Sequence, residues 1–525
     1  PPLYSSAGSD VYKRQDPLGS ENMTRFMGTE TEYGITTPDD QALSPIVSST
    51  HAVVAYAAMN TAARARWDYQ AEHPLKDSRG FDLKRYHTVP VVAPNAIGVA
   101  NVVTSNGARF YVDHAHPEYS SPEVADAYNV MVYDAAGDLI LRQAAERVAQ
   151  LYNEGVSVLE GHDPCPPLKF YKNNVDGKGA SYGSHENYQY SRDTPFEQIA
   201  AGLIPFFVTR QIFAGAGRVG IGEEGEQDGF QISQRADYFF QEVSLETTLN
   251  RGIINTRDEP HADATQFGRL HVIIGDANMS HYANFLKIGT TKLVLDAIEN
   301  GVDFSDLRLK NPVAELKAAS RDLTLRHELS LSDGRCLTPI ALQREYLRRV
   351  SGGEGERSDV DKRVLELWDE VLGDLERDPL STADRLDWTA KYALIKGYVD
   401  RGVPWSDAKL KAVDLQYADI DPAKSLYHAL VRAGRMRTLA TEEEIAHAAA
   451  HPPENSRAYF RGRVAAEFGE DVIASSWQAI QFETAQGPRT VALNAVDGFT
   501  RDDIGELLDR AAGVDDLVAA LVDGK

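Results

Sequence analysis

Alternation of apolar and polar side chains marks the segment that follows Asn106-Gly107, a dipeptide typical of turns. Residues 109–113 alternate strictly, which predicts a strand. On a strand, Arg109, Tyr111 and Asp113 share one face and the two apolar residues between them share the other. A sheet face that carries a guanidinium, a phenol and a carboxylate needs a ligand, a metal ion or a dense hydrogen-bond network to satisfy these groups.

The same period of two runs through residues 25–35 and predicts a second strand, with Glu30 and Glu32 on one face. Two interpretations of these carboxylates stay open. They form the solvent-facing side of an edge strand, as antiparallel sheets often allow, or they bind a divalent metal ion, because hard cations prefer clustered oxygen ligands.

Two further strands are predicted at 181–188 and 269–275. The first places His185 and Asn187 on one face, and the second places Arg269 and His271 on one face. A single histidine on a strand is more often a hydrogen-bonded core residue than a ligand. Two histidines together with several carboxylates favour a metal site, where imidazole and carboxylate ligands cluster.

Helical spacing dominates most of the remaining chain. The glycine-rich piece 215–220 follows a helix rather than a strand, so it is not a dinucleotide-binding fingerprint.

Residues 36–101 form a long excursion between two strands, typical of a lid or a partner-binding loop. A helix is predicted after Glu123, with its apolar side marked by residues between 139 and 151 and its end near Gly155. Other predicted helices cover 55–66 (capped by 48–50), 196–213, 285–301, 360–375 and 388–399, a capped helix begins at Thr441, and a strand covers 475–482.

Composition narrows the class of protein. The chain of 525 residues is 42% hydrophobic and 25% charged, which is ordinary for a globular protein, and no apolar run approaches the roughly 18 residues that span a bilayer. A net charge of −24 argues against nucleic-acid binding. Two distant cysteines form neither a disulfide framework nor a zinc site, which favours a reduced, cytoplasmic setting.

We expect a disordered, non-native-looking leader at 1–22, one large domain at 23–434 and a small C-terminal domain at 435–525.

Several ordered motifs resemble one protein family, the Pup ligases and Pup deamidase/depupylases of actinobacteria, which attach or remove the prokaryotic ubiquitin-like protein Pup. The resemblance extends from about Arg25 into the C-terminal domain. The matching motifs are Gly28-Thr-Glu-Thr-Glu-Tyr-Gly, Asn106-Gly-Ala-Arg, Asp113-His-Ala-His-Pro-Glu-Tyr, Lys172-Asn-Asn, Ser184-His-Glu-Asn-Tyr and Ile254-Asn-Thr-Arg-Asp-Glu-Pro-His-Ala-Asp.

The resemblance implies an α+β fold similar to glutamine synthetase, in which a curved antiparallel sheet forms a cradle backed by helices and a small C-terminal domain packs on it. Within the family, the chain resembles the deamidase/depupylase branch more than the ligase branch. A long inserted loop (38–79) follows the first strand, and an Asp-His-Ala-His-Pro-Glu segment begins at Asp113. That branch hydrolyses the isopeptide bond between Pup and a substrate lysine and deamidates the C-terminal glutamine of Pup.

The resemblance also implies ATP and Mg²⁺ as cofactors, bound without net ATP turnover. The implied partners are Pup and pupylated proteins, with a functional link to the bacterial proteasome and with no nucleic acid or membrane. Asp113 matches the catalytic aspartate, and Glu32 and Trp477 match family positions less closely. The implied metal-associated residues are Glu30, Tyr111, Glu118, His185 and His271, and the implied nucleotide contacts are Ser120, Ser121, Asn187 and Arg269.

Pup is acidic, so an acidic enzyme needs a local basic groove to bind it. Arg210, Arg218, Lys287 and Lys292 are candidates, with ordinary solvated surface charge as the alternative for each. Three other functions stay open at this point: a Pup–protein ligase with the same fold, a small-molecule carboxylate–amine ligase, and a non-catalytic Pup-binding module.

Overall fold

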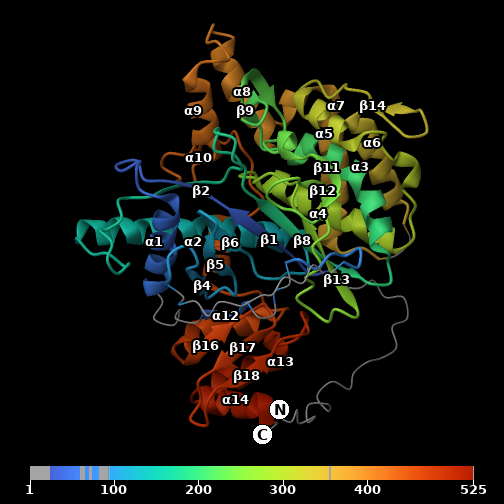
Figure 1. Ribbon diagram of the computed structural model, residues 1–525. Helices are drawn as coiled ribbons and strands as arrows, with labels where there is room; N and C mark the ends of the chain where they lie inside the picture. The colour runs from blue at the N-terminus through green and yellow to red at the C-terminus, as the bar shows by residue number, and fades with distance from the viewer. Residues whose placement is uncertain are drawn as a thin grey trace.

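A six-stranded antiparallel sheet lies at the centre of the computed structural model, which describes residues 24–59, 66–69, 72, 74–81, 93, 95–353 and 356–523 (Figure 1). The expected leader lies outside the described residues. Every neighbouring pair of strands is antiparallel, as predicted. In spatial order the strands are β13 (Phe267–Val272), β8 (Ser184–Ser191), β1 (Met27–Glu32), β6 (His116–Ser120), β5 (Arg109–Asp113) and β4 (Asn101–Val103).

Helices cover one face of this sheet. Thr29 and Thr31 on β1 donate hydrogen bonds to Asp134 on α2, at 3.1 and 3.0 Å, so these alternate residues face the helical layer. Glu30 and Glu32 therefore point to the opposite, open face. The helices nearest the sheet are α1 (Pro45–Met59), α2 (Ala127–Asn153), α3 (Phe196–Ala214) and α4 (His281–Glu299).

The remaining helices of the large unit extend this layer away from the sheet (Figure 1). They share one continuous hydrophobic core with the sheet. They are α5 (Pro312–Arg321), α6 (Pro339–Ser351), α7 (Asp359–Arg377), α8 (Asp387–Val399), α9 (Ala408–Tyr417), α10 (Leu426–Arg432) and α11 (Glu442–Ala450), with 3-10 turns η2 (Ala236–Tyr238), η3 (Ser305–Leu307) and η4 (Pro379–Thr382).

Short paired strands join these helices. They form the pairs β2 (Gly34–Thr36) with β7 (Lys169–Tyr171), β9 (Arg218–Ile221) with β10 (Gln227–Gln231), β11 (Gln241–Ser244) with β12 (Gly252–Asn255), and β14 (Leu329–Ser330) with β15 (Cys336–Leu337).

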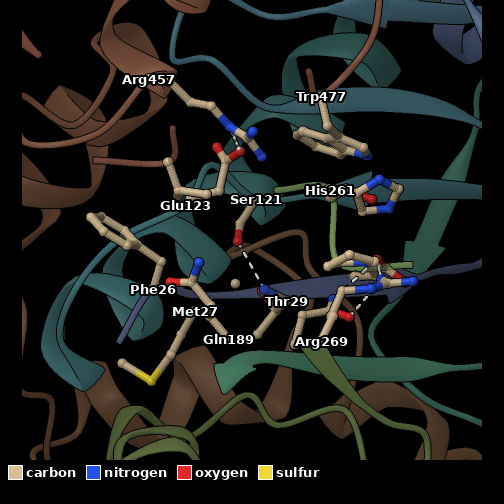
Figure 2. A pocket seen from close by; sticks show the side chains of 16 residues that line it. Phe26, Met27, Thr29, Ser121, Glu123, Gln189, His261, Arg269, Arg457 and Trp477 are labelled. Carbon is tan, nitrogen blue, oxygen red and sulfur yellow. Dashed lines mark hydrogen bonds and ion pairs between the residues drawn. The ribbon is translucent and has the colours of Figure 1, made fainter. Parts of the chain in front are cut away.

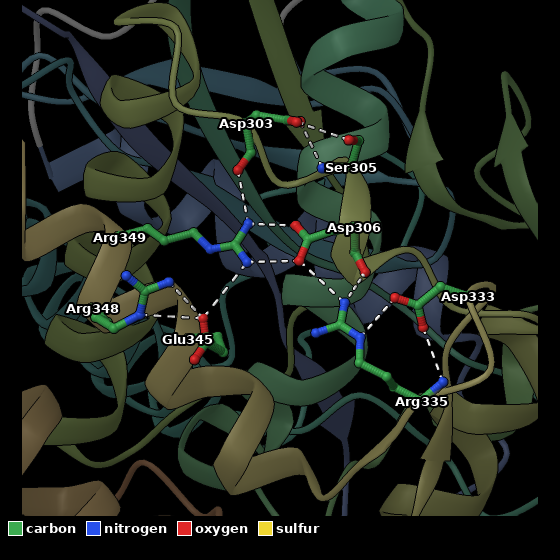
Figure 3. Close-up of polar contacts among 8 residues, drawn as sticks. All are labelled: Asp303, Ser305, Asp306, Asp333, Arg335, Glu345, Arg348 and Arg349. Carbon is green, nitrogen blue, oxygen red and sulfur yellow. Dashed lines mark hydrogen bonds and ion pairs between the residues drawn. The ribbon is translucent and has the colours of Figure 1, made fainter.

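An ion-pair network ties η3, α6 and the β14–β15 hairpin together at the surface (Figure 3). Asp306 accepts from Arg349 at 2.6 Å and from Arg335 at 3.1 Å, and the two guanidiniums hold the pKa of Asp306 down at about 2. Such exposed pairs contribute little individually, so the network positions these segments more than it stabilises the fold.

The C-terminal segment has a hydrophobic core of its own. A four-stranded sheet in the order β18-β17-β16-β3 packs there, and its last strand comes from the inserted segment near the N-terminus. Its elements are α12 (Ala458–Glu467), η5 (Gly469–Asp471), β16 (Val472–Ser475), β17 (Ala479–Phe482), β18 (Arg489–Ala492), α13 (Arg501–Arg510) and α14 (Val514–Asp523), with β3 (Arg66–Trp67).

Helix α11 packs with the large core through Ala448 and Ala449. We therefore propose that the small domain begins after α11, somewhat later than the position 435 expected from the sequence.

Three local predictions were wrong. The strand predicted over 25–35 is interrupted at Tyr33, whose hydroxyl donates to Asp138 at 2.6 Å. The helix predicted over 55–66 begins earlier, at Pro45, and residues 60–65 of that prediction lie outside the described residues. The strand predicted over 475–482 is two strands, because a turn closes where Ser476 N–H donates to Ala479 C=O at 2.8 Å.

Candidate active site

The strand register brings the predicted site residues together on the open face. On β1, Glu30 lies opposite both Ser120 on β6 and His185 on β8. His271 on β13 lies opposite Asn187 on β8. Because same-face side chains on paired strands lie about 5 Å apart, residues far apart in the sequence become neighbours here.

Glu30, His185 and His271 form the first cluster, with ligand atoms all within 4.8 Å of one another. His185 Nδ1 lies 3.4 Å from Glu30 Oε2. Burial raises the pKa of Glu30, but the hydrogen bond with His185 and the charge of Arg269 hold it well below its usual range. Glu30 is therefore a carboxylate at neutral pH, as a cation ligand must be.

The surroundings of His271 are those of a metal ligand. Its Nδ1 lies 2.9 Å from Asn187 Oδ1, which fixes Nδ1 as the protonated nitrogen. Burial and the nearby charge of Arg269 lower the pKa of His271 well below its usual range, so the ring is neutral. Its Nε2 is buried and has no hydrogen-bond partner among the described residues. A neutral imidazole held through one nitrogen, with the other unsatisfied, fits a metal ion.

Glu32, Asp113 and Glu118 form the second cluster, again with ligand atoms within 4.8 Å of one another. Burial and the charges of Asp113, Glu32 and Glu30 raise the pKa of Glu118 well above its usual range. Carboxylates packed this closely repel one another unless a cation or proton neutralises them. Glu32, which matched the family only weakly, therefore lies within the site.

Tyr111 lies beside this second cluster. It is opposite Glu118 in the register, and its hydroxyl accepts from Ser120 at 3.4 Å. Burial and the charge of Glu118 raise the pKa of Tyr111 well above its usual range, so it is a neutral phenol.

Asp113 stands at the exposed end of β5, with its side chain 39% exposed. It pairs with His114 Nδ1 at 3.1 Å, and His114 adopts a left-handed backbone with φ of 51° in the turn to β6. Burial opposes ionisation of Asp113, but the His114 hydrogen bond and the charges of His114, His185 and Arg109 lower its pKa. Asp113 thus offers an accessible carboxylate at neutral pH.

A pocket that is partly open to solvent lies next to Glu30 (Figure 2). All four predicted nucleotide contacts line it: Ser120, Ser121, Asn187 and Arg269.

Within this pocket, Arg269 Nη1 donates to Asn187 at 2.8 Å, and Ser121 Oγ accepts from Thr29 N–H at 2.9 Å. These two hydrogen bonds hold the side chains of Arg269 and Ser121 in place, facing the cavity (Figure 2).

The sequence missed several residues that line the same pocket, among them Phe26, Glu123, His261 and Arg457. Trp477 lines it too, from the turn between β16 and β17. Glu123 accepts from Arg457 at 2.8 Å and also pairs with Arg461. The C-terminal unit therefore supplies one wall of the pocket, which no local pattern could reveal.

Arg109 on β5 packs between the inserted segment and the central sheet. Its guanidinium carbon lies 4.0 Å from the Trp67 ring centre and 3.9 Å from the Tyr111 ring centre. Trp67 in turn packs edge-on against Trp477, at 5.3 Å between centroids. The inserted segment is thus held against the site through its Trp67.

Three of the four candidates for a basic groove are wrong. Arg210 is buried and pairs with Glu186 at 2.6 Å, and Lys292 pairs with Asp361 at 2.9 Å. Lys287 is buried and donates to the Asp276 carbonyl at 2.8 Å. These cations stabilise the helical layer instead.

The open sheet face and its pocket define a class of protein: an enzyme with clustered carboxylates and imidazoles beside a small-ligand pocket. Residues 25–481 match the model of the family described as Pup-ligase protein. The chain belongs to this family.

Relatives from both branches of the family cover most of the chain. It is 49% identical over 509 residues to the Pup deamidase/depupylase of Mycolicibacterium smegmatis, covering 95% of this chain and 100% of that protein. It is 37% identical over 451 residues to the Pup–protein ligase of Xylanimonas cellulosilytica, covering 83% of this chain and 88% of that protein.

Two solved structures have the same fold. The complex of Pup with its ligase PafA superposes with a TM-score of 0.75 at 30% identity, covering 93% of this chain and 92% of that one. PafA in complex with ADP superposes with a TM-score of 0.69 at 32% identity, covering 82% of this chain and 96% of that one. The predicted α+β architecture is confirmed.

Proposed function

We propose that this protein is a Pup deamidase and depupylase. It hydrolyses the isopeptide bond between the C-terminal glutamate side chain of Pup and a substrate lysine, and it deamidates a C-terminal glutamine of Pup to glutamate. Near full-length identity of 49% to a Pup deamidase/depupylase, against 37% to a Pup–protein ligase, carries this conclusion. Pup and pupylated proteins are its partners, in the cytoplasm and upstream of the proteasome.

Both reactions cleave an amide at one carbonyl, so one site serves both. Asp113 is the catalytic residue of the proposal, because its carboxylate is ionised, accessible and at the rim of the acidic cluster. It either accepts a proton from water that attacks the carbonyl, or attacks the carbonyl itself. In the second route the C–N bond breaks, the lysine amine or ammonia leaves with a proton taken from water, and the resulting anhydride is opened by water or hydroxide to restore Asp113. His114 orients the carboxylate through its 3.1 Å contact.

ATP is the proposed nucleotide, bound in the pocket beside Glu30. Support comes from the pocket itself and from the ADP complex of the related PafA. Ser120, Ser121, Asn187 and Arg269 would contact it, and Trp477 offers an aromatic wall for a flat base. Arg269 is the cation best placed to hold phosphate, because it lies between Asn187 and Glu30.

Mg²⁺ is the proposed metal. Glu30, His185 and His271 would hold one ion, and Tyr111 and Glu118, with Glu32, would face a second. When bound, the ions neutralise phosphate and polarise oxygen atoms. The rings of His185 and His271 pack edge to face within this site, with their centroids 4.9 Å apart.

One incubation separates the candidates: purified protein, a pupylated substrate, ATP and Mg²⁺. Release of free Pup and unmodified substrate supports the hydrolase. Formation of new conjugates from Pup ending in glutamate would identify a ligase instead. Steady ATP consumption with free glutamate and an amine would identify a small-molecule ligase.

A further inference from the structure

The turn that follows Asp113 has a strained backbone. Asp113 and His116 lie opposite each other at the facing ends of β5 and β6, so only His114 and Ala115 form the turn between them. His114 has a φ of 51°, in the left-handed region that favours glycine. A non-glycine residue keeps such a conformation only where the surrounding structure holds it, and such residues cluster at active sites. The side chains that hold this turn therefore bear on the position of Asp113.

His116 is the first of these side chains. Its ring stacks on the ring of Tyr182, with centroids 4.3 Å apart and 28° between the ring planes. Its Nδ1 also lies 3.5 Å from Glu32 Oε2. Because His116 and Asp113 are directly opposite in an antiparallel pair, a restraint on His116 is passed to Asp113 across the ladder.

Tyr182 is a rigid support for that stack, because two asparagines bind it at three points. Its N–H donates to the Asn174 carbonyl at 3.0 Å, and Asn174 Nδ2 donates to the Tyr182 carbonyl at 3.1 Å. Its hydroxyl donates to Asn173 Oδ1 at 2.6 Å. The hydroxyl has room there only because residue 34 is glycine, since a Cβ on Gly34 would lie 2.7 Å from it.

The two asparagines belong to the motif Lys172-Asn-Asn, which has no role in the nucleotide pocket or the acidic clusters. Asn174 N–H donates to Gln234 Oε1 at 2.7 Å, and Lys172 Nζ lies 2.7 Å from Asp134 Oδ2 on α2. All three residues of the motif are buried. The support beneath Tyr182 is therefore anchored in the helical layer and not at the surface.

Helix α1 holds the turn from another side. Ser49 is fully buried, and its hydroxyl donates to the Ala115 carbonyl at 2.9 Å. The strained turn is thus fixed both by α1 and by the Tyr182 stack, which is the over-determination that such a conformation needs.

Resting on the proposed function, we infer that Tyr182 is a positioning residue for hydrolysis, which holds the Asp113 carboxylate in its reactive place through the ring of His116. Tyr182 touches no reacting atom in this scheme. A misplacement of about 1 Å at a reacting group can cost roughly 100-fold in rate. Binding of substrate and nucleotide does not depend on that placement, so the effect falls on kcat and not on KM.

The first test removes the stack from the side of His116. Cleavage of a pupylated protein is measured with ATP and Mg²⁺, and ADP affinity is measured in parallel. His116→Ala should lower kcat roughly 10- to 100-fold and leave KM and ADP affinity within about twofold of the wild type. His116→Phe keeps an aromatic ring without its nitrogens, and it should retain at least about a third of the wild-type kcat.

Three results would overturn the inference. They are full activity of His116→Ala, equal losses in His116→Ala and His116→Phe, which would mean that the imidazole nitrogens matter and not the stack, and a raised KM at unchanged kcat, which would place His116 in substrate binding. A wild-type protein that releases no Pup would instead contradict the proposed function.

The second test removes the stack from the side of Tyr182, with Tyr346→Leu as the matched control. Tyr346 is also a buried tyrosine, stacked on Phe304 at 4.7 Å and donating to the Gly202 carbonyl at 2.6 Å, but it lies in the helical layer. Both Tyr182→Leu and Tyr346→Leu should melt at a lower temperature than the wild type. Well below those temperatures, only Tyr182→Leu should lose kcat by roughly 10- to 100-fold, whereas equal losses would indicate general destabilisation and refute the inference.

The double variant checks that both residues act through one contact. His116→Ala combined with Tyr182→Leu should lose little more kcat than the weaker of the two single variants, and losses that multiply would show independent roles and refute the inference. If Tyr182→Leu does not fold, the comparison of His116→Ala with His116→Phe decides alone.

Discussion

Glu123→Gln tests how the two parts of the molecule are held together at the pocket beside Glu30. Glu123 accepts from Arg457 at 2.8 Å and pairs with Arg461, and both guanidiniums are almost fully buried. The neutral variant leaves two buried cations without a counter-charge. Removing one partner from such a group costs about 3 to 5 kcal/mol, which is the loss of unfolding free energy that we expect.

The pKa of Glu123 gives a second measure of the same interaction. Burial raises it, but Arg461 and Arg457 lower it from 4.5 to about 2, which corresponds to about 3 kcal/mol. Because the folded-state pKa is depressed, this stabilisation is complete above pH 4.5 and is lost as the pH falls toward 2. The difference between wild type and Glu123→Gln should therefore shrink progressively below pH 4.5.

Equilibrium urea unfolding at pH 7 and at pH 4 measures both effects. The matched control is Glu454→Gln, which removes an exposed carboxylate paired with Arg501 at 2.6 Å and should cost at most about 1 kcal/mol. If Glu123→Gln is no less stable than Glu454→Gln at pH 7, the two arginines are not held by Glu123 and the reasoning fails.

Two further substitutions probe the proposed cofactor sites. His271→Gln should weaken Mn²⁺ binding, measured by calorimetry, at least tenfold, because it removes the buried, unpartnered Nε2; unchanged affinity would exclude His271 as a ligand. Arg269→Gln should weaken ADP binding roughly 10- to 100-fold through loss of a charge-assisted hydrogen bond, with the melting temperature as the check on folding. ADP titration that gives wild-type affinity would remove Arg269 from the nucleotide site.

Local patterns were enough to place the polar side chains on each strand. A period of two fixes which side of its own strand each residue takes, so Glu30 with Glu32, Tyr111 with Asp113, and Arg269 with His271 were each placed on one face of their strand. Whether these faces come together depends on the order of the strands in the sheet, which strand periodicity could not give. The resemblance implied that order, and the strand register shows it.

The wall of the pocket that faces away from the sheet could not be predicted from strand periodicity. Arg457 and Trp477 come from a separate unit more than 300 residues after Glu123 in the chain, and Trp67 comes from the inserted segment. Packing between distant elements has no periodic signal. The early start of α1 did have a signal, since proline is favoured in the first turn of a helix, as Pro45 shows.

The described helices include none that is long and apolar enough to cross a membrane.

The central claim is that Asp113 cleaves the bond between Pup and its substrate. The most direct measurement compares wild type with Asp113→Asn on a pupylated protein in the presence of ATP and Mg²⁺, with ADP affinity determined in parallel. We predict that the wild type releases free Pup, whereas Asp113→Asn releases none and binds ADP within about twofold of the wild type, because the fold and the pocket are intact. Release of Pup by Asp113→Asn at the wild-type rate would contradict the account.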